Sequence, residues 1–66
     1  MARFITITTK DNSRAFIDLD SVSAVEKQYS DDYLISGPAG NYSFRVSKET
    51  ARLICNKLGL NLNELG

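Results

Sequence analysis

Only one segment of this 66-residue chain has the periodicity of an α-helix, which restricts the folds open to it. In residues 48–58 the apolar side chains recur at i, i+3, i+4 and i+7, namely Ala51, Ile54, Cys55 and Leu58. Ser47 is a suitable N-cap before this segment, and Gly59 suits the left-handed position that ends a helix. The sequence therefore predicts one helix over residues 48–58, placed near the C-terminus.

The rest of the chain has the pattern of short β-strands separated by turns. Alternating or β-branched stretches occupy residues 3–9, 14–19, 22–27, 33–36 and 42–46, and turn-forming residues fill 10–13 and 37–41. Sequential strands are usually neighbours in a sheet. We therefore predict an α+β fold, with an antiparallel meander of four or five strands and the C-terminal helix packed on one face.

The length and the cysteine content limit the size and the cellular setting. A chain this short holds one hydrophobic core, so residues 1–66 are expected to form a single small domain. The lone Cys55 cannot close an intrachain disulfide, and its place on the apolar helix stripe predicts a buried, unreactive thiol. No apolar run has the length of a signal peptide or a membrane span. We expect a cytoplasmic protein with no membrane partner.

The residue types present argue against catalysis and against a cofactor. There is no histidine, and no Lys, Asp or Glu has a known catalytic spacing from a Ser, Thr or Cys nucleophile. Asp18, Asp20 and the pair Asp31 and Asp32 offer carboxylates, but aspartate is common at strand ends and turns for local hydrogen bonding. The spacing of a cation-binding loop is missing. We therefore expect no enzyme activity, no metal and no cofactor.

Charge is balanced overall but unevenly distributed. Eight basic and eight acidic residues give no net charge, whereas residues 45–57 are mainly basic and residues 11–32 mainly acidic. One interpretation is nucleic-acid binding, in which Arg45, Lys48 and Arg52 meet phosphates and Tyr42 stacks on a base. A solvated helix face is the simpler interpretation, because a neutral domain lacks the basic footprint of such binders. Nucleic-acid binding is therefore kept as the alternative function.

Apolar side chains that one helix cannot cover are the main functional indication. If one face of the predicted sheet packs beneath the helix, Phe4, Phe16, Val25 and Leu34 are expected on the outward face. A patch of this kind is typical of a contact surface. We expect a non-catalytic protein-interaction module, a regulatory or accessory protein of bacterial or phage type. Its partner is itself, another protein or both, and the simplest assembly is a two-fold dimer anchored by Phe4 and Phe16, opposed on adjacent strands.

Several short motifs resemble the small flagellar FlbD family over residues 4 to about 54. They are Phe4-Ile5-x-Ile7-Thr8, Asp11-Asn12, Phe16-Ile17-Asp18, Val22-x-Ala24-Val25-Glu26, Tyr33-x-Ile35, Gly40 and Tyr42-x-Phe44-x-Val46-Ser47-x-Glu49. The resemblance implies a hairpin, a strand ending in Glu and a C-terminal helix opened by Ser and Glu. The chain departs from the family at Ser13, where a turn glycine is expected, at the inserted Pro38-Ala39 and in its leucine-rich tail. The resemblance therefore concerns topology rather than motility.

Overall fold

The structure, a computed structural model, describes residues 3–29 and 32–65 and confirms the α+β class. Its strands and helix follow one another as β1 (Phe4–Thr8), β2 (Arg14–Asp18), β3 (Ala24–Lys27), β4 (Tyr33–Ser36), β5 (Ser43–Val46) and α1 (Lys48–Leu58). Short 3-10 turns lie at η1 (Leu19–Ser21), η3 (Pro38–Gly40) and η4 (Leu62–Leu65). Asp31, one of the carboxylates considered above, lies outside the described residues.

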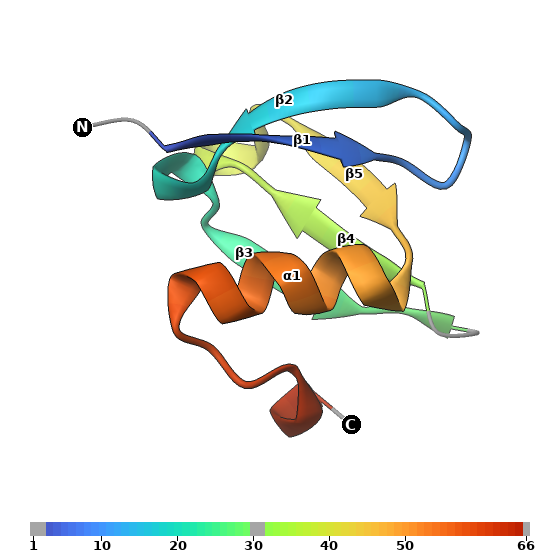
Figure 1. Cartoon of the computed structure of the whole chain (residues 1–66), viewed down its shortest axis with the longest axis vertical. Coiled ribbons are helices and arrows are strands. Elements are labelled where there is room, and N and C mark those ends of the chain that lie inside the picture. The colour runs from blue at the N-terminus through green and yellow to red at the C-terminus, as the bar shows by residue number, and fades with distance from the viewer. Residues whose placement is uncertain (1–2, 30–31, 66) are drawn as a thin grey trace.

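The strands form two antiparallel sheets, so the predicted single sheet of four or five strands is not what the structure shows. β1 pairs with β2, and β3, β4 and β5 pair in that order (Figure 1). The meander continues within each sheet but stops between β2 and β3. A local turn at η1 accounts for this break.

Residues 18–22 fold into a turn that redirects the chain after β2. The Asp18 carboxylate accepts a hydrogen bond from the Asp20 backbone N–H at 3.0 Å, and the Ser21 hydroxyl donates to the Asp18 carbonyl at 2.8 Å. The Val22 N–H then donates to the Leu19 carbonyl. Because these bonds close a 3-10 turn rather than a hairpin, β3 leaves in a direction that lets it pair with β4 but not with β2.

The two sheets meet where β1 ends. The Lys10 N–H donates to the Arg45 carbonyl at 2.8 Å, and the Lys10 ammonium lies 3.0 Å from the Asp32 carboxylate. The turn between β1 and β2 contains Asn12 at a φ of 68°, a left-handed conformation that asparagine tolerates. The hairpin tip is thereby held against β5 and the chain that leads into β4.

The predicted helix is confirmed from Lys48 to Leu58, with both expected ends. The Ser47 side chain accepts a hydrogen bond from the Thr50 N–H, and Gly59 ends the helix at a φ of 77°. The Leu60 N–H donates to the Cys55 carbonyl at 2.8 Å, the long bond of a Schellman ending. Because the residues that cap both ends can be recognised in the sequence, the predicted bounds of the helix match the observed ones.

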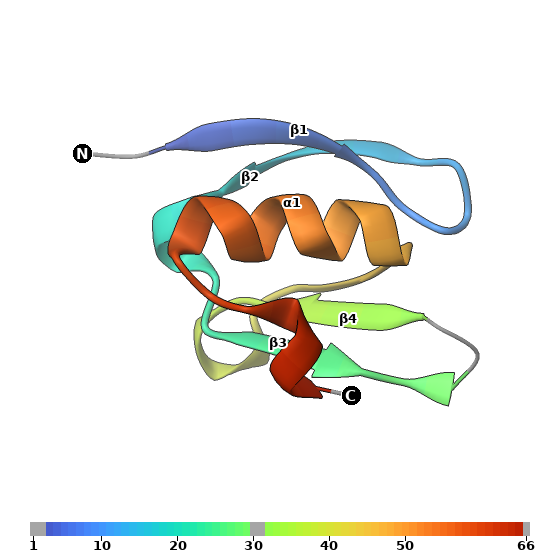
Figure 2. The same cartoon turned by 60° about the horizontal axis from the view of Figure 1, so that its bottom comes forward.

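The core lies where α1 faces the two sheets. Figure 2 shows α1 between the β1–β2 hairpin and the sheet that contains β3 and β4. The buried apolar side chains are Ile7, Ile17, Leu19, Tyr33, Ile35, Val46, Ala51, Ile54, Cys55 and Leu62. Of the tail leucines, Leu62 is buried and Leu65 remains 41% exposed, so η4 contributes one side chain to the core.

The connection between β4 and β5 depends on a close contact between Gly37 and Tyr42. A Cβ atom on Gly37 would overlap the Tyr42 ring, so only glycine fits beside this ring without displacing it. The Gly37 N–H donates to the Tyr42 carbonyl at 3.0 Å, and the chain then reverses through Ala39 and Gly40, both at positive φ. This contact fixes the position of the Tyr42 side chain.

Candidate interaction surface

The outward side of the β1–β2 hairpin, called here the hairpin face, carries the most exposed apolar side chains of the two strands. Because successive strand residues point to opposite sides, burial of Ile7 and Ile17 turns the alternate residues toward solvent. The hairpin face consists of Phe4, Thr6, Thr8, Arg14, Phe16 and Asp18. Phe4 is 64% exposed and Phe16 is 77% exposed, as expected from the sequence.

The register places the two phenylalanines diagonally, not directly opposite as predicted. Phe4 is paired with Asp18, and Phe16 is paired with Thr6. The prediction was wrong because the sequence does not show how many residues the turn takes up. Diagonal cross-strand neighbours still lie within reach of aromatic side chains, so the two rings belong to one apolar patch.

The two ends of the hairpin face carry opposite charge. At one end, the Asp18 carboxylate accepts from the Arg3 N–H at 3.1 Å and from the Asp20 N–H at 3.0 Å, and Arg3 forms a 2.9 Å ion pair with Asp20. At the other end, the Arg14 guanidinium has no hydrogen bond or ion pair with any described residue. The face is therefore apolar in its middle, acidic at the Asp18 end and basic at the Arg14 end.

The other two predicted interface residues do not belong to this surface. The pairing of Val25 with Ile35 puts Val25 on the side of its sheet that faces the core, where it packs against the buried cluster. The prediction that Val25 faces outward is therefore wrong, because the register of β3 on β4 decides which alternate residues point inward. Leu34 is paired with Arg45, lies on the opposite side of that sheet and is half-buried.

Two residues of the nucleic-acid alternative, Tyr42 and Arg45, point to opposite sides of the chain at β5. The Tyr42 ring packs against Gly37 and lies 5.5 Å from the Phe44 ring, and its hydroxyl lies 3.0 Å from the Ser21 hydroxyl. Arg45 is an odd number of residues away, so it lies on the other side of the strand. Lys48 and Arg52 are exposed on α1. The three cations thus remain accessible, but the aromatic ring is part of the fold's own packing.

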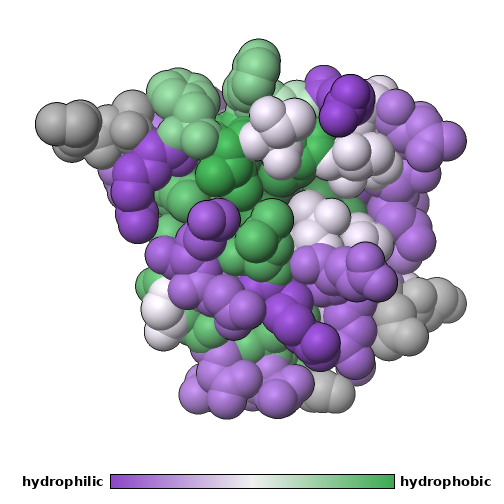
Figure 3. Space-filling model, viewed as in Figure 1, coloured by the Kyte–Doolittle hydropathy of each residue, from purple (hydrophilic) through white to green (hydrophobic). Residues whose placement is uncertain are grey.

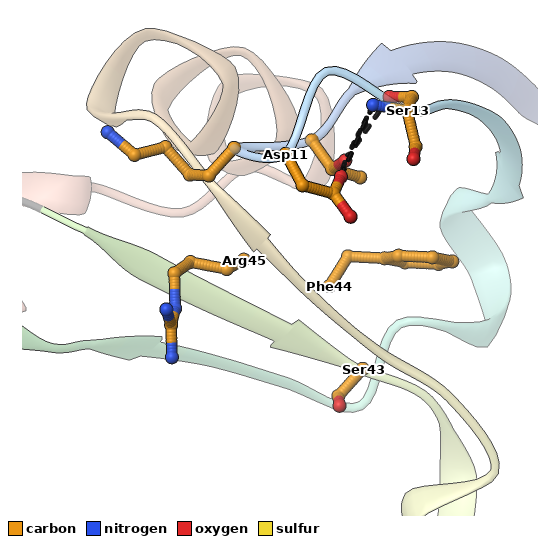
Figure 4. Close-up of a pocket in the computed structure, with 7 residues that line it drawn as sticks. Asp11, Ser13, Ser43, Phe44 and Arg45 are labelled. Atoms are coloured by element: carbon orange, nitrogen blue, oxygen red, sulfur yellow. Dashed lines mark hydrogen bonds between the residues drawn. The ribbon is translucent and has the colours of Figure 1, made fainter.

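A pocket of about 290 Å³ lies between the β1–β2 turn and β5 (Figure 4). Its lining residues are Thr9, Lys10, Asp11, Ser13, Ser43, Phe44 and Arg45. The Asp11 carboxylate accepts hydrogen bonds from the Thr9 hydroxyl and from the Ser13 N–H, and these bonds lower the pKa of Asp11. Figure 4 shows Phe44 and Arg45 pointing away from each other from β5. These bonds lie within the β1–β2 turn, so Asp11 serves to shape that turn.

Cys55 and the acidic side chains are the other groups that the sequence offered for chemistry. Cys55 is a free thiol, buried as predicted, and burial raises its pKa. Within residues 3–29 and 32–65, no three Cys, Asp or Glu side chains are grouped as ligands for a metal ion. None of the helices in this same part of the chain is long and apolar enough to cross a membrane.

Sequence reasoning missed some exposed apolar side chains outside the hairpin face. They are Tyr29, Leu53, Leu60 and Leu65. The sequence did indicate that Leu53 is exposed, because Leu53 lies two residues after Ala51 and off the apolar stripe of the helix. Figure 3 shows apolar surface gathered over the hairpin and continuing onto the adjoining part of α1, with smaller apolar areas among polar surface in the lower part of that view.

A comparison of this chain with protein-family models, curated proteins and solved structures finds no match. The resemblance to the FlbD family therefore stays a prediction that rests on the sequence motifs alone.

Proposed function

We propose that this chain is a non-catalytic protein-interaction module that binds its partner through the hairpin face. The setting that we propose is the cytoplasm of a bacterium, in which the protein has a regulatory or accessory role of bacterial or phage origin. The observation that supports the proposal is the exposure of Phe4 and Phe16 side by side on a strand pair whose other side already supplies the core. A contiguous exposed apolar patch with a polar rim is often a contact surface.

The size of the aromatic patch indicates how strong such binding can be. A buried aromatic side chain covers about 150–250 Å², so the exposed parts of Phe4 and Phe16 together offer roughly 280 Å². At about 25 cal/mol per Å², covering this area contributes about 7 kcal/mol. Association costs about 4–15 kcal/mol, so the partner must add comparable apolar area for stable binding. The hairpin face therefore suits a reversible complex.

Nucleic-acid binding is the second candidate because Arg45, Lys48 and Arg52 are exposed and no ion pair occupies them within the described residues. A stacked base needs an open aromatic ring, and the Tyr42 ring is packed against Gly37 and Phe44. Such binding would weaken steeply as salt rises and would be lost in an Arg45→Ala, Arg52→Ala variant. This salt dependence separates it from a contact made by the hairpin face.

Site-specific photo-crosslinking tests the proposal and does not require an identified partner. The photoreactive residue p-benzoylphenylalanine replaces Phe16 in the producing cell, and the matched control carries it at Tyr29, an exposed aromatic outside the hairpin face. We expect protein adducts of defined mass from position 16 that are absent when Phe4→Asp is added. Absence of any adduct specific to position 16 contradicts the proposed function.

A further inference from the structure

We infer that a second copy of this chain binds the hairpin face, with the two hairpins stacked face to face and their strands antiparallel. This inference rests on the proposed function, since it identifies the partner of the same surface. It depends on how charges and aromatic rings are distributed along β2. The relevant side chains are Arg14 at one end, Phe16 in the middle and Asp18 at the other end.

Face-to-face stacking of two identical surfaces places the two-fold axis in the plane between them. One possible axis runs across the strands and passes through the pair formed by Thr6 and Phe16. That axis exchanges the two ends of the face, so Arg14 lies over Asp18 of the partner subunit and Phe16 lies over the partner's Phe16. Two ion pairs then flank a central aromatic contact.

A second axis that also keeps the strands aligned runs along them, between β1 and β2. It would place Arg14 over Thr8 of the partner subunit and Asp18 over the partner's Phe4, which leaves all four charges without a counter-charge. Complementary charges steer association and fix the register of an interface. The charge pattern of the face therefore favours the axis across the strands.

The Arg14 and Asp18 side chains are available for these contacts. Arg14 is exposed and has no partner among the described residues, and one oxygen of the Asp18 carboxylate accepts both of its hydrogen bonds. The second carboxylate oxygen is free, within the described part of the chain, to meet a guanidinium. Strands of five residues are only about 17 Å long, so the interface is smaller than that of a stable dimer. We therefore expect a weak, concentration-dependent dimer.

A double-mutant cycle measured by sedimentation tests this arrangement. The variants are Arg14→Gln, Asp18→Asn and the double variant, and the asparagine side chain keeps an oxygen that can accept the local hydrogen bonds. Each single substitution removes both ion pairs of the dimer, so we expect each to weaken dimerisation by about 3- to 10-fold, and the double variant by no more than either single one. Arg52→Gln, the same change on α1, is the matched control and should leave dimerisation unchanged.

Each contrary result identifies the step that fails. Additive effects of Arg14→Gln and Asp18→Asn overturn the antiparallel arrangement. If the wild-type protein stays monomeric up to about 1 mM, the inference that the partner is a second copy is overturned. Adducts of the Phe16-substituted protein with a different protein would then still support the proposed function. A dimer that survives both Phe16→Asp and the milder Phe16→Thr, each checked for folding by circular dichroism, contradicts both proposals.

Discussion

Replacing Gly37 with alanine tests the contact that fixes Tyr42. The φ of Gly37 is −90°, which alanine adopts without strain, so any loss of stability must come from the methyl group and the Tyr42 ring. Overpacking costs about 1–3 kcal/mol, and a ring that moves away also loses its hydrogen bond to Ser21, worth about 1 kcal/mol. We expect a loss of about 2–4 kcal/mol, against a total of about 3–10 kcal/mol for a chain of this length.

Urea unfolding followed by far-ultraviolet circular dichroism gives this free energy. Gly40→Ala is the matched control, because a Cβ atom on Gly40 would meet no other part of the chain within 4 Å and Gly40 has a φ of 72°. It should therefore lose only the backbone cost of about 1–2 kcal/mol. In a Tyr42→Ala background, Gly37→Ala should have almost no effect. An equal cost of Gly37→Ala in the presence and absence of the Tyr42 ring would refute the steric explanation.

Three further predictions concern single groups. Ser47→Ala removes the helix cap and should lower the free energy of unfolding by about 1 kcal/mol in urea titrations, whereas the exposed strand variant Ser43→Ala should stay within about 0.5 kcal/mol of wild type. The hydrogen bonds of Asp11 lower its pKa in the fold. The stabilising effect of the Asp11 carboxylate is therefore complete at a pH above the unfolded pKa of 3.8, and it is lost as the pH falls through the lower folded pKa. Asp11→Asn should flatten the decline of the melting temperature in that acid range. The buried Cys55 thiol should react with iodoacetamide only as the chain unfolds, and rapid complete alkylation of the folded protein, read by mass spectrometry, would contradict its burial.

The features that the sequence predicted correctly depend on neighbours within a few positions. Ser47 and Gly59 bracket the helix because capping bonds reach only three to five residues along the chain. The alternation of β1 and β2 separated Ile7 and Ile17 from Phe4 and Phe16 for the same reason. The burial of Cys55 followed from its place on the helix stripe. These patterns are local, so a single sequence carries them.

Features that depend on distant pairing could not be predicted in this way. Alternation shows which residues of a strand share a side, but it does not show which side meets the core. Val25 faces inward because β3 pairs with β4 in a register that places it beside Ile35. Tyr42 is packed inward because Gly37 and Ser21, five and 21 residues earlier in the chain, meet its ring and its hydroxyl. The division into two sheets depends on which strand β3 pairs with, and the turn at η1 directs β3 toward β4 instead of β2.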